Sequence, residues 1–328
     1  MRVLIIGAAG MIGRKLADRL ARDGAIAGRP IETLMLSDVV QPPVPQMFSG
    51  TIESIVLDLS SHSNAQTLIA ARPDVIFHLA AVVSGEAEAD FEKGYRINLG
   101  GGGALFEAIR TESNVQPYCP RVVFCSSIAV FGPPFAEPIG DDFITAPQTS
   151  YGTQKAMTEL LLADYSRRGF LDGIGIRLPT ICIRPGKPNA AASGFFSNIL
   201  REPLIGQEAV LPVDDSVRHW FASPRAAIGF LLHGAGMDLA QLGSRRTLNM
   251  PGLSATVAEE IEALRQFAGD KAVALIRREP DETIAKIVAG WPYDFAPKRA
   301  LSLGFVAETE FSQIIAAHIE DELGGTLP

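Results

Sequence analysis

A glycine-containing turn near the amino terminus restricts the fold of this chain more than any other feature. The residues VLIIGAAGMIGRKL place Gly7, Gly10 and Gly13 between an apolar run at 3–7 and a segment at 11–24 with helical apolar spacing. The apolar run predicts a buried strand, and the second segment predicts an amphipathic helix. In such a strand–turn–helix unit the helix N-terminus faces an anion such as the pyrophosphate of a dinucleotide. The stretch therefore predicts a dinucleotide-binding domain.

The three glycines have separate roles in that prediction. Gly7 permits the tight turn, Gly10 lets the backbone approach a pyrophosphate closely, and Gly13 lets the helix pack against the strand. Their spacing is GxxGxxG rather than GxGxxG. The strand–turn–helix context makes this a more specific signal than glycines alone.

Two acidic residues after the next strands indicate which dinucleotide binds. Asp38 ends a predicted strand at 33–38. A carboxylate there accepts hydrogen bonds from a ribose 2′-OH and repels a 2′-phosphate, which favours NAD over NADP. Asp58 ends a predicted strand at 54–59 and is placed to reach the adenine. A turn-forming role is the alternative interpretation of Asp38.

The first half of the chain alternates short apolar runs with longer amphipathic segments. Runs that are apolar throughout and separated by helices predict a parallel sheet covered on both faces. The predicted fold class is α/β, a doubly wound Rossmann sheet with a smaller, mostly α carboxyl-terminal lobe. Further strands are predicted at 73–81, 121–127 and 173–180, and helices at 64–72, 86–110 and 151–168.

The alternation stops after the sixth predicted strand. Residues 183–196 are rich in Pro, Gly and small side chains, which is typical of a loop. We expect residues 1–180 to form the NAD-binding domain, with 216–250 returning to it. We expect 181–215 and 251–328 to form the substrate-binding lobe.

Composition excludes several classes of partner. The 29 basic and 37 acidic residues give a net charge of −8, which opposes binding to nucleic acid or an anionic membrane. Cys119, Cys125 and Cys182 form no CxxC pair and are expected to be thiols in a reducing compartment. No apolar stretch is long enough for a membrane span, and no His, Cys and carboxylate cluster has metal-ligand spacing. We expect a cytoplasmic, metal-free protein that acts on a small molecule.

The residues TSYGTQKA place the Tyr151 phenol and the Lys155 ammonium four positions apart at the start of a helix-forming segment. A solvated helix face is the simpler interpretation. A free phenol has a pKa near ~10, and an ammonium one turn away lowers it toward the working pH. Ser127 would hydrogen-bond the reacting oxygen and hold it near the phenol. Together the three residues predict a proton-transfer site.

The sequence resembles the extended short-chain dehydrogenases/reductases, the NAD-dependent epimerase/dehydratase family, over most of its length. The resemblance rests on GAAGMIG, on HLAA at 78–81, on Asn98 in YRINLGGG, on SSIAVFG at 126–132 and on TSYGTQK. It implies that Tyr151 is the acid/base, that Lys155 also holds the nicotinamide ribose, and that Ser127 rather than Ser126 is catalytic. The implied cofactor-binding set is Gly7, Gly10, Met11, Ile12, Gly13, Asp38, Asp58, Leu79, Ala80, Ala81, Asn98, Tyr151, Lys155, Pro179 and Thr180.

Departures from the family pattern reduce the number of activities that the sequence supports. Family dehydratases have an Asp-Glu pair directly after the catalytic hydroxyl residue, where this chain has Ile128 and Ala129. Many sugar-nucleotide members carry a stretch like RDFIHVDDLA, where this chain has RHWFASPRAA at 218–227. Arg218 is retained but the acidic residues are replaced, which predicts a more basic pocket wall suited to a small acid.

Longer stretches at 84–102, 179–204 and 218–227 resemble the D-erythronate dehydrogenase subgroup. This narrower resemblance implies NAD-dependent oxidation of a four-carbon sugar acid at C2 to a 2-keto acid. An arginine would bind the carboxylate bidentately, while His219 is expected to pack or to orient a ligand. For Lys187 and Asn189, loop ordering is an equal alternative. The predicted substrate contacts are Ser84, Ser127, Tyr151, Lys187, Asn189, Arg218 and Arg225.

Two other functions stay open at this point. A nucleotide-sugar epimerase would keep NAD bound and return the hydride, which gives no net NADH. An NAD-binding regulator would keep the glycine turn but has no need of Ser127, Tyr151 and Lys155. The family resemblance also implies a homodimer, for which the apolar face of AMTELLLAD at 156–164 would serve unless it is buried core.

Overall fold

The computed structural model describes residues 1–186 and 192–327 as two compact units, each built from three segments of the chain. Both units are therefore discontinuous in sequence. Which unit binds the cofactor and which the substrate stays a prediction. The first unit contains Met1–Ser127, Thr149–Arg177 and Ile228–Leu248, and the second contains Ile128–Gln148, Leu178–Ala227 and Asn249–Pro328.

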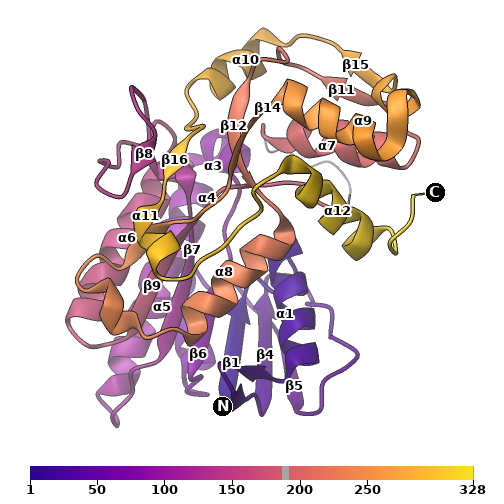
Figure 1. Ribbon diagram of the computed structural model, residues 1–328. Helices are drawn as coiled ribbons and strands as arrows, with labels where there is room; N and C mark the ends of the chain where they lie inside the picture. Colours follow the sequence, from indigo (N-terminus) through magenta and orange to yellow (C-terminus); the bar gives the residue numbers. More distant parts are fainter. Residues whose placement is uncertain (187–191, 328) are drawn as a thin grey trace. The chain divides into compact units, whose positions relative to one another are not determined.

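The first unit is organised around one seven-stranded sheet (Figure 1). β1 lies inside the sheet and pairs in parallel with β4 and β6, and β5 and β7 extend the two sides in parallel. The chain winds outward from β1 in both directions, which confirms the predicted doubly wound α/β class. In spatial order the strands are β13 (Thr247–Asn249), β9 (Asp172–Leu178), β7 (Arg121–Ser127), β6 (Val75–His78), β1 (Arg2–Ile6), β4 (Thr33–Asp38) and β5 (Thr51–Val56).

The parallel register brings the carboxyl ends of the central strands to one edge of the sheet. Ile6 pairs with Ser37 on one side and with His78 on the other, and His78 pairs with Phe124. The loops that follow these residues therefore start side by side. This is the edge at which open α/β sheets bind ligands.

Helices cover both faces of this sheet. A Cβ added to Gly173 of β9 would lie 2.7 Å from Leu162 of α6, whereas one added to Gly234 of α8 would contact Ile174 and Ile176 of β9. Because side chains alternate between the two faces of a strand, α6 and α8 lie on opposite faces. The helices of this unit are α1 (Met11–Asp23), α2 (His62–Ile69), α3 (Ser84–Ala89), α4 (Phe91–Gly94), α5 (Gly101–Ser113), α6 (Ser150–Arg167), η3 (Leu239–Leu242) and the later part of α8 (Pro224–Gly236), and a small hairpin joins β2 (Ala25–Ile26) to β3 (Arg29–Pro30).

The sequence predicts that residues 86–110 are helical, and the structure forms consecutive helical elements there with one break. The segment forms α3, α4, a π-helical stretch η1 (Tyr95–Gly100) and then α5. Asp90 ends α3 with a backbone φ of −128°, and its side chain accepts a hydrogen bond from the N–H of Lys93 at the start of α4. A short polar side chain competes with the helix backbone in this way. The prediction that this segment is helical is therefore confirmed, apart from the break at Asp90.

The sequence also predicts a strand at 54–59, whereas β5 covers Thr51–Val56. β5 is the last strand at one edge of the sheet, and its side chains are half-buried or exposed, so that no apolar run marks it. Asp58 belongs to the turn that follows, where its Oδ1 atom accepts a hydrogen bond from the N–H of Ser60.

The second unit has its own core and three small sheets. Phe196, Ile199, Phe221, Leu264 and Ile314 are fully buried there. β12 pairs in parallel with β10 and antiparallel with β14. The elements are η2 (Ile128–Val130), β8 (Ile139–Gly140), β10 (Thr180–Ile181), α7 (Gly194–Leu204), β11 (Ala209–Leu211), β12 (Arg218–Ala222), β14 (Leu253–Thr256), α9 (Val257–Val273), β15 (Ile276–Arg278), α10 (Glu282–Ala289), β16 (Phe295–Ala296), α11 (Lys298–Ser302) and α12 (Phe311–Glu322).

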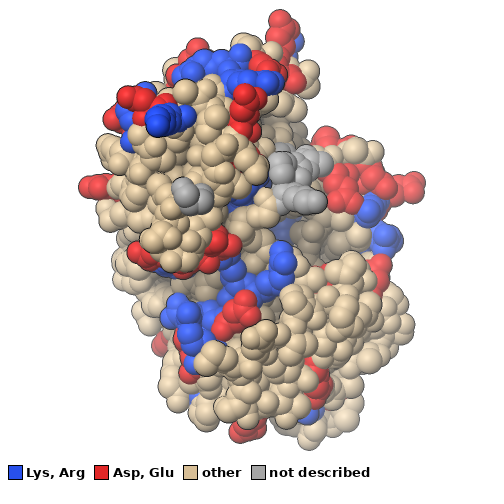
Figure 2. All heavy atoms as spheres, turned by 90° about the vertical axis from the view of Figure 1, so that its right-hand side faces the viewer, with Lys and Arg blue, Asp and Glu red and all other residues tan. Residues whose placement is uncertain are grey.

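The described residues contain no helix that is both long and apolar enough to cross a membrane. On the face seen in Figure 2, Lys and Arg side chains lie next to Asp and Glu side chains in several places. Charges of both signs are therefore mixed on this face.

Candidate active site

The glycine turn has the backbone geometry that its sequence predicts. Gly7 has a φ of +92°, and its N–H donates to the carbonyl of Ser37 on β4. A Cβ at Gly7 would lie 2.6 Å from the N atom of Ala80, and one at Gly13 would lie 2.1 Å from the carbonyl oxygen of Gly7. Neither position has room for a side chain, so both glycines are required by the protein itself.

Gly10 differs from the other two glycines. A Cβ at Gly10 would find its nearest neighbour, the carbonyl oxygen of Gly7, at 3.4 Å, which is ordinary contact. Gly10 is the N-cap of α1, and neither a side-chain cap nor an acidic first-turn residue occupies that helix end. The backbone N–H groups of Met11 and Ile12 begin the helix there. This open N-terminus fits a pyrophosphate, which is the role predicted for Gly10.

Asp38 is held in place at the end of β4. Its Oδ2 atom accepts a hydrogen bond of 2.8 Å from the N–H of Ala9 in the glycine turn, and its Oδ1 atom accepts one of 2.7 Å from the N–H of Val39. A carboxylate oxygen has a second lone pair. The carboxylate is thus fixed beside the turn and can still accept bonds from ribose hydroxyls.

Asp58 is fixed by a different set of contacts. Its Oδ2 atom accepts a hydrogen bond of 2.9 Å from Arg96, and its Oδ1 atom accepts one from the hydroxyl of Ser60. Partial burial raises the pKa of Asp58, but the hydrogen bonds from Ser60 and Arg96 outweigh this and hold it below its ordinary value. The carboxylate is therefore ionised at the predicted adenine position.

Asn98 joins the loop after β6 to the helix that carries Tyr151. Its side chain accepts a hydrogen bond from the N–H of Val82 and donates to the carbonyl of Val82. It also donates to Oε1 of Gln154 on α6 at 2.7 Å. The role behind the site that the resemblance implies for Asn98 stays a prediction. The predicted cofactor residues Leu79, Ala80 and Ala81 lie in the same loop.

Tyr151 and Lys155 lie in the first turns of α6. The hydroxyl of Thr149 accepts a hydrogen bond from the N–H of Gly152, and Glu88 of α3 accepts one from the N–H of Ser150. Both bonds satisfy orphan N–H groups at the helix start. The start of α6 is thereby fixed on either side of Tyr151.

The Lys155 ammonium is directed toward the end of β7. Its Nζ atom donates to the carbonyl of Cys125 at 2.8 Å and lies 5.6 Å from the centre of the Tyr151 ring. Cys125 is two residues before Ser127, the last residue of β7. The structure thus brings together the ends of the two elements that carry Ser127, Tyr151 and Lys155.

Burial governs the electrostatics of this pair. Only 2% of Lys155 is exposed, and this burial lowers the pKa of Lys155 below 10.5, while Cys125 and Glu159 oppose the change. Burial, with a smaller contribution from Lys155, lowers the pKa of His78 on β6 to about 3. His78 is therefore neutral near pH 7.

The second unit contains the predicted residues Pro179 and Thr180. The Thr180 hydroxyl and His219 Nε2 are 2.6 Å apart. The His219 ring stacks on Phe196 at an angle of 3°, and burial lowers the pKa of His219 to about 3. His219 is thus a packed, neutral histidine that orients Thr180, in line with the interpretation that it is not a base.

The two predicted arginines of the second unit are balanced by carboxylates. Arg218 donates to the carbonyl of Ser254 and lies 3.4 Å from Glu259. Arg225 pairs with Glu320 and Asp321 of α12. Both arginines of the predicted basic pocket wall are therefore paired with carboxylates in the structure. Of the other predicted substrate contacts, Ser84 begins α3, and Lys187 and Asn189 lie outside the described residues.

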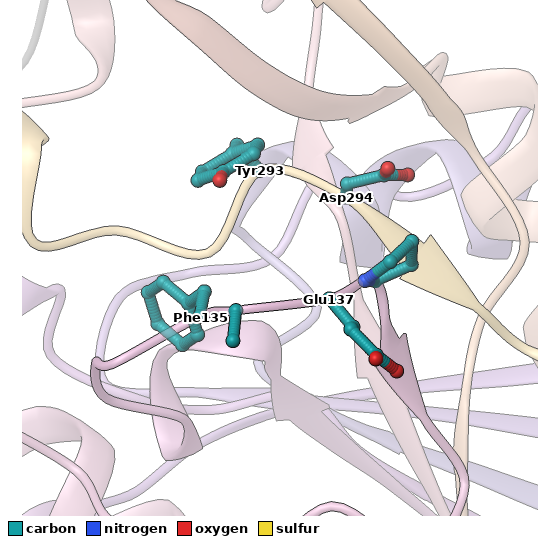
Figure 3. A pocket seen from close by; sticks show the side chains of 6 residues that line it. Phe135, Glu137, Tyr293 and Asp294 are labelled. Atoms are coloured by element: carbon teal, nitrogen blue, oxygen red, sulfur yellow. The ribbon is translucent and has the colours of Figure 1, made fainter.

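A small hollow of the second unit contains none of the predicted site residues. Phe135, Ala136, Glu137 and Pro138 line one side, and Tyr293 and Asp294 line the other (Figure 3). The rings of Phe135 and Tyr293 meet edge to face. We assign no chemistry to this hollow. Among the described residues no group of His, Cys, Asp and Glu side chains is arranged to hold a metal ion.

A hydrogen-bonded group near Lys155 was not predicted from the sequence. Ser126, Glu159 and Arg177 form a buried hydrogen-bonded group. Glu159 follows Lys155 by four residues, which is a signal that it lies one turn further on the same helix. Ser126 and Arg177 carry no comparable signal.

The parallel sheet, the glycine turn and the Tyr151–Lys155 pair are those of an NAD-dependent oxidoreductase. Residues 3–222 match the family described as the NAD dependent epimerase/dehydratase family, and the chain belongs to this family. NAD is the cofactor of this class, and the open α1 N-terminus at Gly10 and the fixed carboxylate of Asp38 fit its pyrophosphate and ribose.

Three relatives resemble the chain over nearly its whole length. It is 46% identical to the D-erythronate dehydrogenase of Cupriavidus necator, with 98% of each chain covered. It is 41% identical to the D-erythronate dehydrogenase of Haemophilus influenzae, with 98% of this chain and 100% of the relative covered. A crystal structure described as the nucleoside-diphosphate-sugar epimerase from Agrobacterium tumefaciens is 66% identical, with a TM-score of 0.98 and coverage of 100% and 96%.

Proposed function

We propose that this NAD-dependent dehydrogenase oxidises D-erythronate at C2 to 2-keto-D-erythronate. The observation that carries the proposal is the whole-length similarity to two D-erythronate dehydrogenases from different bacteria. The Ile128 and Ala129 positions, which lack the acid and base of a dehydratase, support oxidation over elimination.

The proposed chemistry uses three side chains of the first unit. Bound NAD supplies the hydride acceptor. Tyr151, as the phenolate, takes the proton of the C2 hydroxyl. Lys155 lowers the pKa of the phenol through its charge, and Ser127 holds the hydroxyl by a hydrogen bond.

The remaining assignments rest on the same proposal. The first unit would bind NAD through the glycine turn, Asp38 and Asp58, and Lys155 would also hold the nicotinamide ribose. Pro179 and Thr180 would contact the nicotinamide. Substrate contacts are proposed for Ser84, Ser127, Tyr151, Lys187, Asn189, Arg218 and Arg225, with Lys187 and Asn189 outside the described residues.

A nucleoside-diphosphate-sugar epimerase is the alternative. It is favoured by the description of the crystal structure that is 66% identical to this chain. An epimerase returns its hydride and releases no NADH. The two functions therefore differ in a product that absorbance measures directly.

The deciding experiment measures initial rates of NADH formation with purified protein. NAD is combined separately with D-erythronate, with L-threonate and with UDP-sugars. The proposal predicts steady NADH formation with D-erythronate and a lower rate with its stereoisomer. Interconversion of a UDP-sugar without NADH formation would instead establish the epimerase.

We also propose a homodimer that uses the outer face of α6. Leu160 is 73% exposed and Met157 is 39% exposed on this helix, while Thr158 and Leu162 are buried within the unit. The buried side of the helix is core of the unit, and the exposed side is the face that we propose for the partner. Met157 and Leu160 are three residues apart and therefore lie on the same face of the helix, and neighbouring exposed apolar side chains support an interface more than single ones do.

Leu160→Arg is expected to convert the dimer to a monomer, because a desolvated guanidinium without a partner opposes association. Size-exclusion chromatography with light scattering measures the mass. Val306→Arg is the matched control, because Val306 is 74% exposed and lies in the second unit. A wild-type protein that is monomeric, or a Leu160→Arg variant that stays dimeric, would contradict the proposal.

A cytoplasmic location remains a proposal as well. Cys119, Cys125 and Cys182 are all free thiols in the structure. Free thiols are typical of proteins in a reducing compartment.

A further inference from the structure

We propose that Glu159 is a positioning residue for the proton-transfer site, acting on Lys155 by its charge and on Ser127 through Ser126. The proposal rests on the proposed function in so far as it concerns the rate of the reaction. It also concerns the ionisation of Tyr151, which is measured without any substrate.

Glu159 is bonded to two strands at once. Its Oε1 atom accepts a hydrogen bond of 2.5 Å from the hydroxyl of Ser126 on β7 and one of 2.9 Å from Nε of Arg177 on β9. Its Oε2 atom accepts one of 2.6 Å from Nη2 of Arg177. The pair is bidentate, which fixes the direction of the carboxylate as well as its distance.

This group is buried inside the first unit. The exposed fractions of the Glu159 and Arg177 side chains are 6% and 13%, and that of Ser126 is 1%. Burying two charges is costly unless they are well paired and hydrogen-bonded. Stability alone is thus a weak reason for placing a charged pair here, and the location of the pair points to the adjacent site.

The location ties Glu159 to the proposed catalytic residues. Glu159 follows Lys155 by one helical turn on α6, and Ser126 directly precedes Ser127 on β7. The hydrogen bond from Ser126 to Glu159 therefore fixes the strand end that carries Ser127 against the helix that carries Lys155. A shift of one element along the other would move Ser127 relative to Lys155.

The negative charge of Glu159 stabilises the protonated form of Lys155. Burial lowers the pKa of Lys155, and Glu159 acts in the opposite direction. Burial also keeps His78 neutral and raises the pKa of the Cys125 thiol, so neither of these is a counter-charge near pH 7. Within the described part of the chain, the titratable groups with a printed interaction with Lys155 are His78 from β6, Cys125 from β7, and Tyr151 and Glu159 from α6.

Removal of the Glu159 charge is expected to lower the pKa of Lys155. In Glu159→Gln the Lys155 ammonium loses a stabilising carboxylate, and the charge of Arg177 becomes uncompensated nearby. Both changes lower the pKa of Lys155. Lys155 then loses its proton at a lower pH, and without that proton it no longer favours the Tyr151 phenolate.

A second ion pair between the same two strands provides a matched control. At the amino ends of β7 and β9, Asp172 accepts hydrogen bonds from Arg121 and from Arg246. Asp172→Asn breaks a comparable pair at the opposite end of the sheet. Both variants are expected to lower the thermal midpoint, but only Glu159→Gln reaches the proton-transfer site.

The first test is the pH dependence of kcat for the wild type, Glu159→Gln and Asp172→Asn with NAD and D-erythronate. At high pH kcat is expected to fall, and we call this fall the alkaline limb. In Glu159→Gln its midpoint is expected about one pH unit below that of the wild type. In Asp172→Asn its midpoint is expected at the wild-type pH. An unchanged limb in Glu159→Gln, together with a lowered thermal midpoint, would mean that the ion pair only stabilises the fold and would overturn the proposal.

Ser126→Ala tests the alignment of β7 with α6 separately, because it keeps the ion pair between Glu159 and Arg177 intact. It also serves as the test if Glu159→Gln does not fold. Its kcat is expected to fall roughly tenfold with KM unchanged, because the strand end that carries Ser127 is released. Its alkaline limb should stay at the wild-type pH. A wild-type kcat in Ser126→Ala would contradict the alignment role.

The ionisation of Tyr151 separates this inference from the proposed function. Ultraviolet absorbance of tyrosinate is followed against pH in each protein and in its Tyr151→Phe counterpart, and the difference reports Tyr151. The midpoint is expected at a higher pH in Glu159→Gln than in the wild type, because the ammonium is lost earlier. A shifted midpoint in a protein that oxidises no sugar acid would refute the proposed function alone. An unshifted midpoint would refute the role of Glu159.

Discussion

Tyr151→Phe is expected to lower kcat/KM for NAD-dependent oxidation of D-erythronate by about 10²–10⁴-fold, the range that general acid–base groups contribute. Phenylalanine keeps the ring but removes the hydroxyl that accepts the substrate proton. Lys155 and its hydrogen bond to Cys125 are unchanged by the substitution. The loss should therefore appear mainly in the chemical step, and any loss of NAD affinity should be much smaller than the loss of kcat/KM.

The matched control is Tyr165→Phe, which removes a second hydroxyl from the same helix. Tyr165 bonds to Glu107 of α5, away from Lys155. We expect its activity to stay close to that of the wild type. NADH formation gives the rates, and calorimetric titration gives the NAD affinity. A Tyr151→Phe enzyme with wild-type activity would assign proton transfer to another group.

Local patterns predicted the central strands of the sheet well. The strand predicted at 121–127 coincides with β7, and that at 33–38 coincides with β4. Both strands lie inside the sheet, so their apolar residues are continuous in the sequence. β5 lies at the edge with half-exposed side chains, and its position could not be predicted because burial no longer dictates its composition.

The close packing of the 86–110 segment depends on tertiary contacts. A Cβ at Gly94 would lie 2.7 Å from the amide of Gln154 on α6 and 3.1 Å from the side chain of Ala87. Gly94 is thus a close-contact glycine between α4 and α6. The sequence contains several glycines here, and no local pattern identifies which of them another helix approaches.

The predicted and unpredicted parts of the site differ in whether they depend on a local sequence pattern or on contacts between distant residues. The glycine turn and the Tyr151–Lys155 pair are contiguous motifs, so residue type and spacing were enough. The partners of Glu159 come from two other strands, and the carboxylates that balance Arg225 are 95 and 96 residues away in the sequence. Such pairs follow from packing and have no signature in one sequence.

Gly13→Ala is expected to destabilise the protein by about 3 kcal/mol or more, at the upper end of the overpacking range. The added Cβ would lie 2.1 Å from the carbonyl oxygen of Gly7, and backbone cannot move aside as a flexible side chain can. Helix propensity acts in the opposite direction, since Ala is favoured over Gly by about 1 kcal/mol. The steric cost is larger than the gain in helix propensity, so denaturant unfolding should show a lower free energy of unfolding than in the wild type.

Gly103→Ala is the control for propensity. Gly103 lies in α5, and a Cβ there would meet nothing within 4 Å. This variant should be as stable as the wild type or more stable, by up to about 1 kcal/mol. If Gly13→Ala unfolds at the same denaturant concentration as Gly103→Ala, then the contact between α1 and the glycine turn is looser than the structure indicates.

Gly10→Ala distinguishes a requirement of the fold from a requirement of the cofactor. The backbone of Gly10 has a φ of −69° and a ψ of 166°, which alanine adopts freely, and its Cβ would have room in the protein alone. The stability of this variant should therefore change by about 1 kcal/mol or less. A pyrophosphate at the α1 N-terminus would meet the added methyl group, so the affinity for NAD should fall by about tenfold or more, which is at least about 1.4 kcal/mol. Unchanged NAD affinity in Gly10→Ala, measured by calorimetric titration, would place the pyrophosphate away from this turn.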